Sequence, residues 1–151
     1  MRRTLADRLT DTDYLLHADM FNVKAFPTRA QVVNTGLGET NLLNVAGGLA
    51  KTGKTVYIYG VAGFVIHRYE QLKFSCRNFG SKDGRIIICN AGKYGYDKFG
   101  PGHALDDDIG LMQVLGIPHY SPETVLEFEH ILDHILAQPN GIYYIQLGKD
   151  Q

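Results

Sequence analysis

The feature that most constrains this fold is a strand, a glycine turn and a helix that follow one another over residues 31–50. Residues 31–33 are apolar and β-branched enough for a buried strand. Gly36 and Gly38 then allow a tight turn, and apolar residues at helical spacing follow: Leu42, Leu43, Ala46, Leu49 and Ala50. Glu39 therefore lies where a strand ends and a helix begins, which is where open α/β sheets bind ligands. Position alone favours an ordinary first-turn acid that faces the helix dipole.

The rest of the chain alternates between strand and helix patterns. Strands are expected at residues 13–19, 55–59, 84–89, 117–120 and 141–147, and helices at 3–10, 63–79 and 106–115. A last helix is expected to start with Ser121 as N-cap and Pro122 in its first position, and Gly53 and Gly116 are expected to end helices. This rhythm predicts an α/β fold with a parallel β-sheet sandwiched by helices, as one domain over residues 1–151.

Composition narrows the class of protein. Charged residues make up 21% of the chain and the net charge is -1, so no basic excess points to nucleic acid. No segment approaches the ~20 apolar residues of a membrane helix, and no signal peptide is evident. Cys76 and Cys89 lack metal-like spacing and are expected to be reduced, buried thiols. We therefore expect a cytoplasmic protein that binds neither nucleic acid nor membrane.

Residues 34–39 and 46–50 resemble the "NVGIAEQ…AAGLA" stretch of transketolase-type thiamine-diphosphate enzymes. There the stretch belongs to the pyrimidine-binding module, which 1-deoxy-xylulose-5-phosphate synthase and the β subunit of 2-oxo-acid dehydrogenases share. Glu39 matches the family glutamate that hydrogen-bonds a ring nitrogen of the cofactor's aminopyrimidine. That bond favours the imino tautomer, whose exocyclic nitrogen takes the proton from the thiazolium carbon and so creates the nucleophile. The resemblance thus implies thiamine diphosphate as cofactor and Glu39 as a catalytic and cofactor-binding residue.

The resemblance extends along nearly all of the chain. Residues 26–29 resemble the family's "FPDRF", residues 94–109 its "YGPLGPTHHSIEDIAIMR", and residues 141–148 its "GPVYIRLGR", with which the pyrimidine-binding module ends. The implied domain is a single pyrimidine-binding module over 1–151, with the family's diphosphate-binding and C-terminal domains absent.

Residues 64–71 are similar to the family's "FLTLRAFEQ" and imply further cofactor contacts. Phe64 matches an aromatic ring that stacks on the aminopyrimidine. Without the resemblance, an ordinary core aromatic is the favoured interpretation of Phe64. The family arginine of this segment corresponds to His67 in one register and to Arg68 in the other, and the sequence leaves both open.

His103 is the residue expected to act on the substrate. It ends the long irregular stretch 90–103, and long loops in compact domains are usually functional. An imidazole that titrates near neutrality can move protons on sugar hydroxyl and carbonyl groups. The resemblance implies that this histidine contacts the substrate or the cofactor-bound intermediate. His130 and His134 are four residues apart on a predicted helix, but no third metal ligand accompanies them.

The sequence departs from the family pattern at three places that concern substrate recognition and metal binding. The acid that often precedes the family histidine is replaced by Phe99, with Lys98 beside it, and the second histidine is Ala104. These changes predict a donor other than the standard pentose phosphate. The family's magnesium-binding "GDG…N" motif lies on a separate domain. Here residues 82–85 lead straight into a strand and lack the spacing of that motif, so the Mg²⁺ ligands are expected on a partner subunit.

Together these observations predict the pyrimidine-binding subunit of a split thiamine-diphosphate-dependent transketolase-like enzyme. It would transfer a two-carbon ketol or acyl-anion unit from a sugar-type or 2-oxo donor to an aldehyde acceptor. The expected partner is a diphosphate-binding transketolase-like subunit, with self-association in an α2β2 assembly. The alternatives are a 2-oxo-acid dehydrogenase β-like subunit, a non-catalytic homologue that acts as an interaction partner, and a small flavodoxin-like binding module.

Overall fold

In the computed structural model, which describes residues 1–20, 27–91, 100, 103 and 107–147, the chain is built around one β-sheet. Its strands lie in the order β2-β1-β3-β4-β6-β5, and every neighbouring pair is parallel. Their bounds are β1 Tyr14–His17, β2 Gln31–Asn34, β3 Thr55–Gly60, β4 Arg85–Asn90, β5 His119–Tyr120 and β6 Gly141–Gln146. The predicted fold class, an α/β protein with a parallel sheet, is confirmed.

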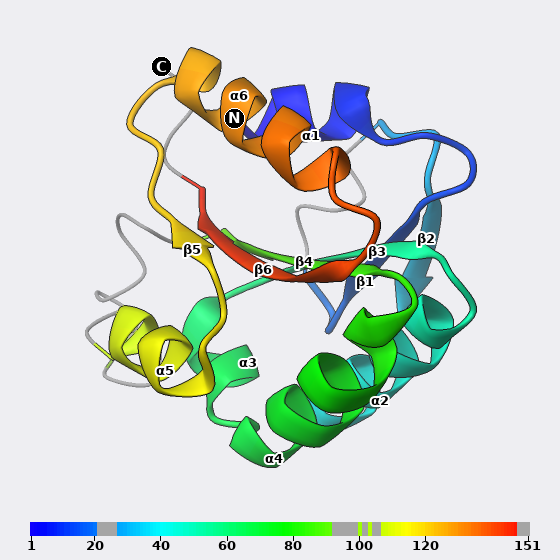
Figure 1. Cartoon of the computed structure of the whole chain (residues 1–151), viewed down its shortest axis with the longest axis vertical. Coiled ribbons are helices and arrows are strands. Elements are labelled where there is room, and N and C mark those ends of the chain that lie inside the picture. The colour runs from blue at the N-terminus through cyan, green and yellow to red at the C-terminus, as the bar shows by residue number, and fades with distance from the viewer. Residues whose placement is uncertain (21–26, 92–99, 101–102, 104–106, 148–151) are drawn as a thin grey trace.

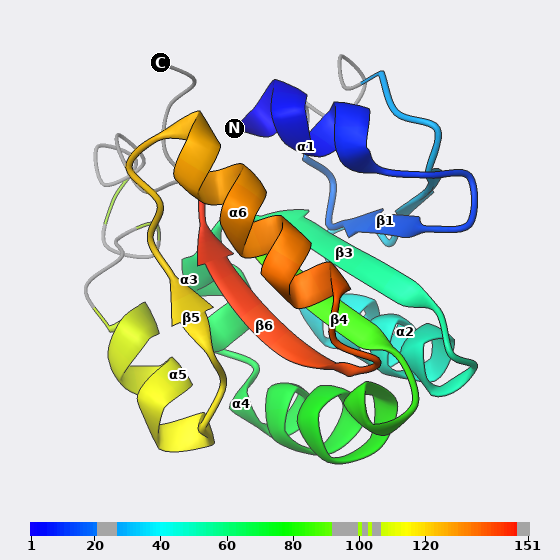
Figure 2. The same cartoon turned by 45° about the horizontal axis from the view of Figure 1, so that its top comes forward.

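Helices cover both faces of this sheet (Figures 1 and 2). On one face lie α1 (Arg2–Arg8) and α6 (Val125–Leu136). On the other lie α2 (Glu39–Lys51), α3 (Ala62–Ile66), α4 (Tyr69–Gln71), η2 (Leu72–Phe79), η3 (Gly80–Lys82) and α5 (Asp108–Leu115). Successive side chains of β4 alternate between the two apolar layers, with Ile86 and Ile88 in one and Ile87 and Cys89 in the other. A fully apolar strand such as β4 is what a sheet buried on both faces requires.

The expected continuous helix over residues 63–79 is wrong. The chain leaves helical geometry at Arg68 (φ -100°, ψ 50°), resumes as α4, and then widens into the π-helical η2. Close contact with α2 accounts for the altered path: Ser75 Oγ donates to Asn44 Oδ1 at 2.6 Å and Cys76 Sγ to the Leu43 carbonyl at 3.3 Å. This tertiary contact leaves no trace in hydrophobic periodicity, so the sequence alone predicted one unbroken helix.

The start of α6 also differs from the prediction. Thr124, not Ser121, is the N-cap, and its hydroxyl accepts the N–H of Glu127 at 3.1 Å in a capping box. Ser121 instead donates to the Gln146 side chain at 2.5 Å. The two expected helix-ending glycines are confirmed, since Gly53 (φ 82°) and Gly116 (φ 62°) adopt left-handed conformations just after α2 and α5.

Both cysteines are free and buried, as expected. Burial raises the pKa of the Cys76 and Cys89 thiols to about 12, so both remain protonated and unreactive in the folded protein.

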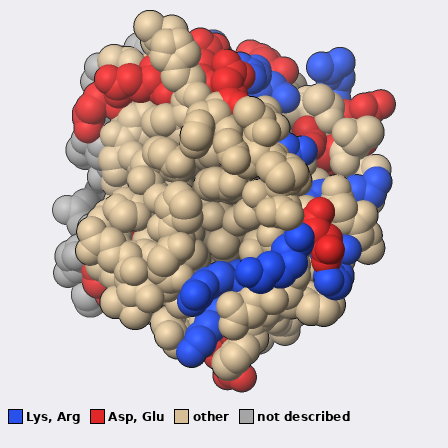
Figure 3. Space-filling model, viewed as in Figure 1, with Lys and Arg blue, Asp and Glu red and all other residues tan. Residues whose placement is uncertain are grey.

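The surface carries charges of both signs. Figure 3 shows acidic side chains gathered over the α6 side of the molecule and a band of basic side chains across the η2 side. Among the helices of the described residues, none has the length and hydrophobicity needed to span a bilayer.

Candidate functional site

The sheet topology places a crevice between β1 and β3. The chain passes from β1 outward to β2 and then crosses back to β3 on the other side of β1 (Figure 1). At such a switch point the loops at the carboxyl ends of the strands diverge and leave room for a ligand. A small crevice of about 20 Å³ lies there, and the segments that follow β1, β2 and β3 all contribute to its lining: Ala18, Met20, Glu39, Leu42, Tyr59, Gly60, Val61, Phe64 and Val65.

Glu39 reaches this crevice as the first residue of α2. Gly36, at φ 69°, turns the chain after β2, and Gly38 is the N-cap of the helix. The Glu39 side chain is half-buried, and Leu42, one helical turn later, lines the crevice beside it. The arrangement puts one carboxyl group at the edge of a mostly apolar crevice.

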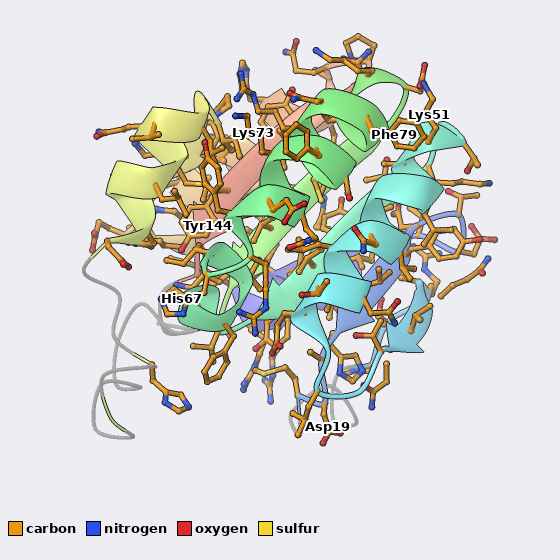
Figure 4. The ribbon with its side chains drawn as sticks, turned by 90° about the horizontal axis from the view of Figure 1, so that it is seen from below. Asp19, Lys51, His67, Lys73, Phe79 and Tyr144 are labelled. Atoms are coloured by element: carbon orange, nitrogen blue, oxygen red, sulfur yellow. The ribbon has the colours of Figure 1, made fainter. Side chains whose placement is uncertain are left out.

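The loop that carries Glu39 is held by Asn34, at the end of β2. The Asn34 Oδ1 accepts the N–H of Gly36 at 2.9 Å and that of Asp19 at 3.0 Å. Thr35 N also donates to the His17 carbonyl at 2.9 Å, which ties the loop to the end of β1. Asp19 has a φ of 51° and lies at the end of the molecule where α2 begins, opposite Lys51 (Figure 4).

Sequence reasoning gave these supporting residues no role. An asparagine two residues before a glycine is a recognisable turn signal, so the bond from Gly36 to Asn34 could have been anticipated. Nothing local connects Asn34 with Asp19, because that contact depends on the parallel pairing of β1 with β2.

His17, at the end of β1, is buried beside the loop that carries Glu39. It is 7% exposed, and its Nδ1 accepts the Met20 N–H at 3.1 Å. Burial lowers the pKa of His17, and the nearby Asp19 opposes this effect only in part. The imidazole is therefore neutral at pH 7 and serves as a hydrogen-bond acceptor.

Phe64 and His103 lie against each other. Their ring centroids are 4.8 Å apart and the rings are inclined by 75°, an edge-to-face contact. Phe64 is 37% exposed and lines the same crevice as Glu39. The backbone N–H of His103 donates to the Gly100 carbonyl at 3.0 Å. Three predicted site residues that are far apart in sequence are thus brought to one end of the molecule. Lys98, Phe99 and Ala104, which carry the expected departures in substrate recognition, lie outside the described residues.

His67 and Arg68 are not among the residues that line this crevice. Both side chains are exposed at the bend between α3 and α4. His67 lines a separate open hollow toward α5, together with Ile66, Tyr69, Asp107, Gly110, Leu111 and Val114. Figure 4 shows His67 on the α3 side, away from the end of β1 marked by Asp19.

No group of three or more His, Cys, Asp or Glu side chains that could hold a metal ion occurs within residues 1–20, 27–91, 100, 103 and 107–147. His130 and His134 lie on α6, in the helical layer on the opposite face of the sheet from α2.

No protein-family model matches the chain. Among curated proteins it is similar to an apulose-4-phosphate transketolase subunit of Actinobacillus succinogenes, with 32% identity over 131 residues, or 85% of this chain and 40% of that protein. It is also similar to a putative transketolase C-terminal section of Methanocaldococcus jannaschii, with 28% identity over 129 residues, or 83% of this chain and 39% of that protein. An uncharacterized 33.6 kDa protein of the Rhodococcoides fascians fasciation locus is 29% identical over 120 residues, or 73% of this chain and 38% of that protein. The chain spans about two-fifths of the length of these relatives.

Two solved structures show the same fold. A split-gene transketolase, described as an inactive beta4 tetramer, superposes with a TM-score of 0.69 and 26% identity over 99% of this chain and 49% of the other. A transketolase from Campylobacter jejuni gives a TM-score of 0.68 over 95% of this chain and 24% of the other, and at 9% identity it supports the fold alone.

Proposed function

We propose that this chain, a relative of the transketolase-type proteins, is the pyrimidine-binding subunit of a split transketolase-like enzyme that depends on thiamine diphosphate. The observation that carries the proposal is the shared crevice of Glu39 and Phe64 at the β1/β3 switch point, with His103 against the Phe64 ring. These residues come from three separated segments, and all three match the family motifs.

The crevice fits an aminopyrimidine ring chemically. Its walls include Met20, Leu42 and Val65, which suit a flat, weakly polar ring, and Phe64 offers an exposed aromatic surface for stacking. Glu39 supplies a single half-buried carboxyl that can hold a proton at a ring nitrogen. When bound, thiamine diphosphate would supply the nucleophile and electron sink for transfer of a two-carbon unit.

Each residue then has a distinct role. Glu39 would share a proton with the pyrimidine ring nitrogen, Phe64 would orient that ring, and His103 would exchange protons with hydroxyl or carbonyl oxygens of a sugar-type or 2-oxo substrate. His67 or Arg68, at the bend between α3 and α4, is proposed as a further cofactor contact that lies outside the crevice. The diphosphate and its Mg²⁺ would be held by a second, diphosphate-binding subunit, and two copies of each subunit would form an α2β2 assembly.

The test is the rate at which the thiazolium C2 proton of thiamine diphosphate exchanges with deuterium, which needs no knowledge of the substrate. Exchange and tight cofactor binding in the presence of Mg²⁺ are expected when the chain is mixed with a diphosphate-binding transketolase-like subunit, and not with the chain alone. Glu39→Gln, which replaces the carboxyl by an amide, should slow exchange about a hundredfold or more, in the range that acid–base groups contribute.

Glu70→Gln is the matched control, because Glu70 is an exposed first-turn acid on α4 that does not line the crevice. Glu39→Gln should keep the unfolding midpoint of the wild-type chain. A proven complex of the two subunits that never binds the cofactor would refute the catalytic proposal and leave a non-catalytic interaction partner. Activity with 2-oxo acids and an oxidised lipoyl (disulfide) acceptor would instead identify a 2-oxo-acid dehydrogenase β-like subunit.

A further inference from the structure

A buried polar cluster lies where α5 packs against β6. Asp108, 2% exposed, accepts two hydrogen bonds at Oδ2: from the Tyr144 hydroxyl and from Gln146 Nε2, each at 2.5 Å. Ser121 Oγ donates to the Gln146 Oε1 at 2.5 Å and extends the cluster to the segment before α6. None of these residues lines the crevice of Glu39.

Burying a carboxylate is unfavourable unless hydrogen bonds compensate for its lost hydration. Asp108 has such compensation, since it begins α5, where the helix dipole favours negative charge, and receives both side-chain donors. Burial first, and then the hydrogen bond to Asp108, raises the pKa of the Tyr144 phenol, so Tyr144 stays protonated and donates. The cluster fixes the first residue of α5 to the carboxyl end of β6.

That anchor bears on His103, because Asp108 is the fifth residue after it. Five residues span at most about 18 Å, so fixing Asp108 limits where His103 can lie. The same core also joins α5 to α3, the helix of Phe64: Met112 and Leu115 pack in one cluster with Val65. The side chain of Tyr144 extends from β6 into this helical layer (Figure 4).

We propose that Asp108 is a positioning residue for His103, held in place by Tyr144 and Gln146. It touches neither cofactor nor substrate, and it sets the start of α5 so that the His103 imidazole meets the Phe64 ring at the crevice. This role rests on the proposed function for its effect on turnover, whereas its effect on His103 geometry can be measured on the chain by itself.

The experiment compares two neighbouring tyrosines of β6. Tyr144→Phe removes the hydroxyl that donates to Asp108, and Tyr143→Phe removes a hydroxyl that donates to the Asn140 carbonyl at 3.0 Å on the other face of the sheet. The first readout is the NMR shift of the His103 ring protons in the full chain, which the Phe64 ring 4.8 Å away displaces. Tyr144→Phe should change these shifts, and Tyr143→Phe should leave them as in the wild type.

The second readout is kinetic. In the reconstituted enzyme, Tyr144→Phe should lower kcat/KM tenfold to about a hundredfold, as small displacements of a reacting group do, with cofactor affinity unchanged. Asp108→Asn keeps a carbonyl acceptor and should retain more activity than Asp108→Ala. Unchanged His103 signals in Tyr144→Phe would refute the positioning role whatever the activity. An inactive wild-type mixture would refute the proposed function while the NMR comparison still decides the positioning role.

Discussion

At the scale of single residues, the proposed cofactor site depends on one carboxyl and one aromatic ring with different tasks. Glu39 is half-buried and can exchange a proton, whereas Phe64 keeps 37% of its surface exposed and offers its ring for stacking. The same ring is also in contact with His103. Phe64 therefore connects the cofactor side of the proposed site with the substrate side.

Phe64→Ala should weaken binding of thiamine diphosphate to the reconstituted pair about tenfold, because an aromatic stack contributes about 0.5–1.5 kcal/mol beyond burial. Calorimetric titration with Mg²⁺ present measures this change. Phe74→Ala is the control, since Phe74 is 56% exposed on η2 and does not line the crevice. Equal affinities in the two variants would argue against stacking by Phe64.

The lowered pKa of His17 predicts how the stability of the folded chain depends on pH. Its folded pKa lies below the ordinary 6.5, so below that value the unfolded chain binds a proton more readily than the folded chain. The contribution of His17 to stability is therefore present above pH 6.5 and is lost as the pH falls through 6.5 toward the folded pKa. Protonation of Nδ1 would also remove the acceptor for the Met20 N–H.

The free energy of unfolding in urea, measured at pH 7.5 and 5.5, tests this expectation. The wild type should lose stability at the lower pH, and His17→Asn, which cannot titrate, should lose less. His134→Asn serves as control, because His134 lies on α6, away from the β1 end, and its replacement should leave the wild-type pH dependence intact. A His17→Asn variant with the same pH dependence as the wild type would contradict the assignment.

At the scale of elements, α2 and the η2–η3 segment touch through their backbones. A Cβ added to Gly47 would lie 2.3 Å from the Ser75 carbonyl oxygen, and one added to Gly80 would lie 2.5 Å from the Gly47 oxygen. Gly48, the next residue of α2, has no neighbour within 4 Å of its added Cβ and is exposed. Two adjacent glycines of one helix thus serve different purposes.

Gly47→Ala should destabilise the chain by about 1–3 kcal/mol, the usual range for overpacking against atoms that cannot move freely. Gly48→Ala should stabilise it by about 0.5–1 kcal/mol, because alanine favours the helix and nothing obstructs its methyl group. Urea unfolding of both variants gives the comparison. Equal effects with the same sign would show that helix propensity, rather than the α2–η2 contact, determines tolerance at these positions.

The same contact explains what the sequence could and could not predict about the elements. Local patterns sufficed for β3, β4 and β6, whose apolar runs are buried on both faces, and for the turn that delivers Glu39. They failed at Arg68, where packing of η2 on α2 breaks a helix that periodicity extends. They failed again at Ser121, which resembles an N-cap but is drawn into a hydrogen bond with Gln146 on β6. In both cases the deciding partner is distant in sequence.

The residues of the candidate site were likewise predictable only where a local motif marks them. Glu39, Phe64 and His103 followed from motif resemblance, and the fold brings them to one end of the sheet. Asp19 and Asp108 were not singled out, because their roles depend on strand pairing that places β1 beside β2 and β6 beside β4.

At the scale of the whole molecule, one exposed side chain is placed where a partner would cover it. Leu37 is 85% exposed in the loop between β2 and α2, two residues before Glu39. Full burial of a leucine contributes about 1.5–3 kcal/mol. If the diphosphate-binding subunit covers the crevice, as proposed, it also contacts Leu37.

Leu37→Ser should therefore weaken association of the two subunits about tenfold to a hundredfold, measured by sedimentation at several concentrations without cofactor. The chain alone should keep its unfolding midpoint, because the side chain makes little contact in the monomer. Leu126→Ser is the matched control: Leu126 is 61% exposed on α6, in the helical layer on the opposite face of the sheet from α2. Loss of association in Leu126→Ser with full association in Leu37→Ser would place the partner on the α6 face and leave the Glu39 crevice uncovered, which is incompatible with a cofactor shared between two subunits.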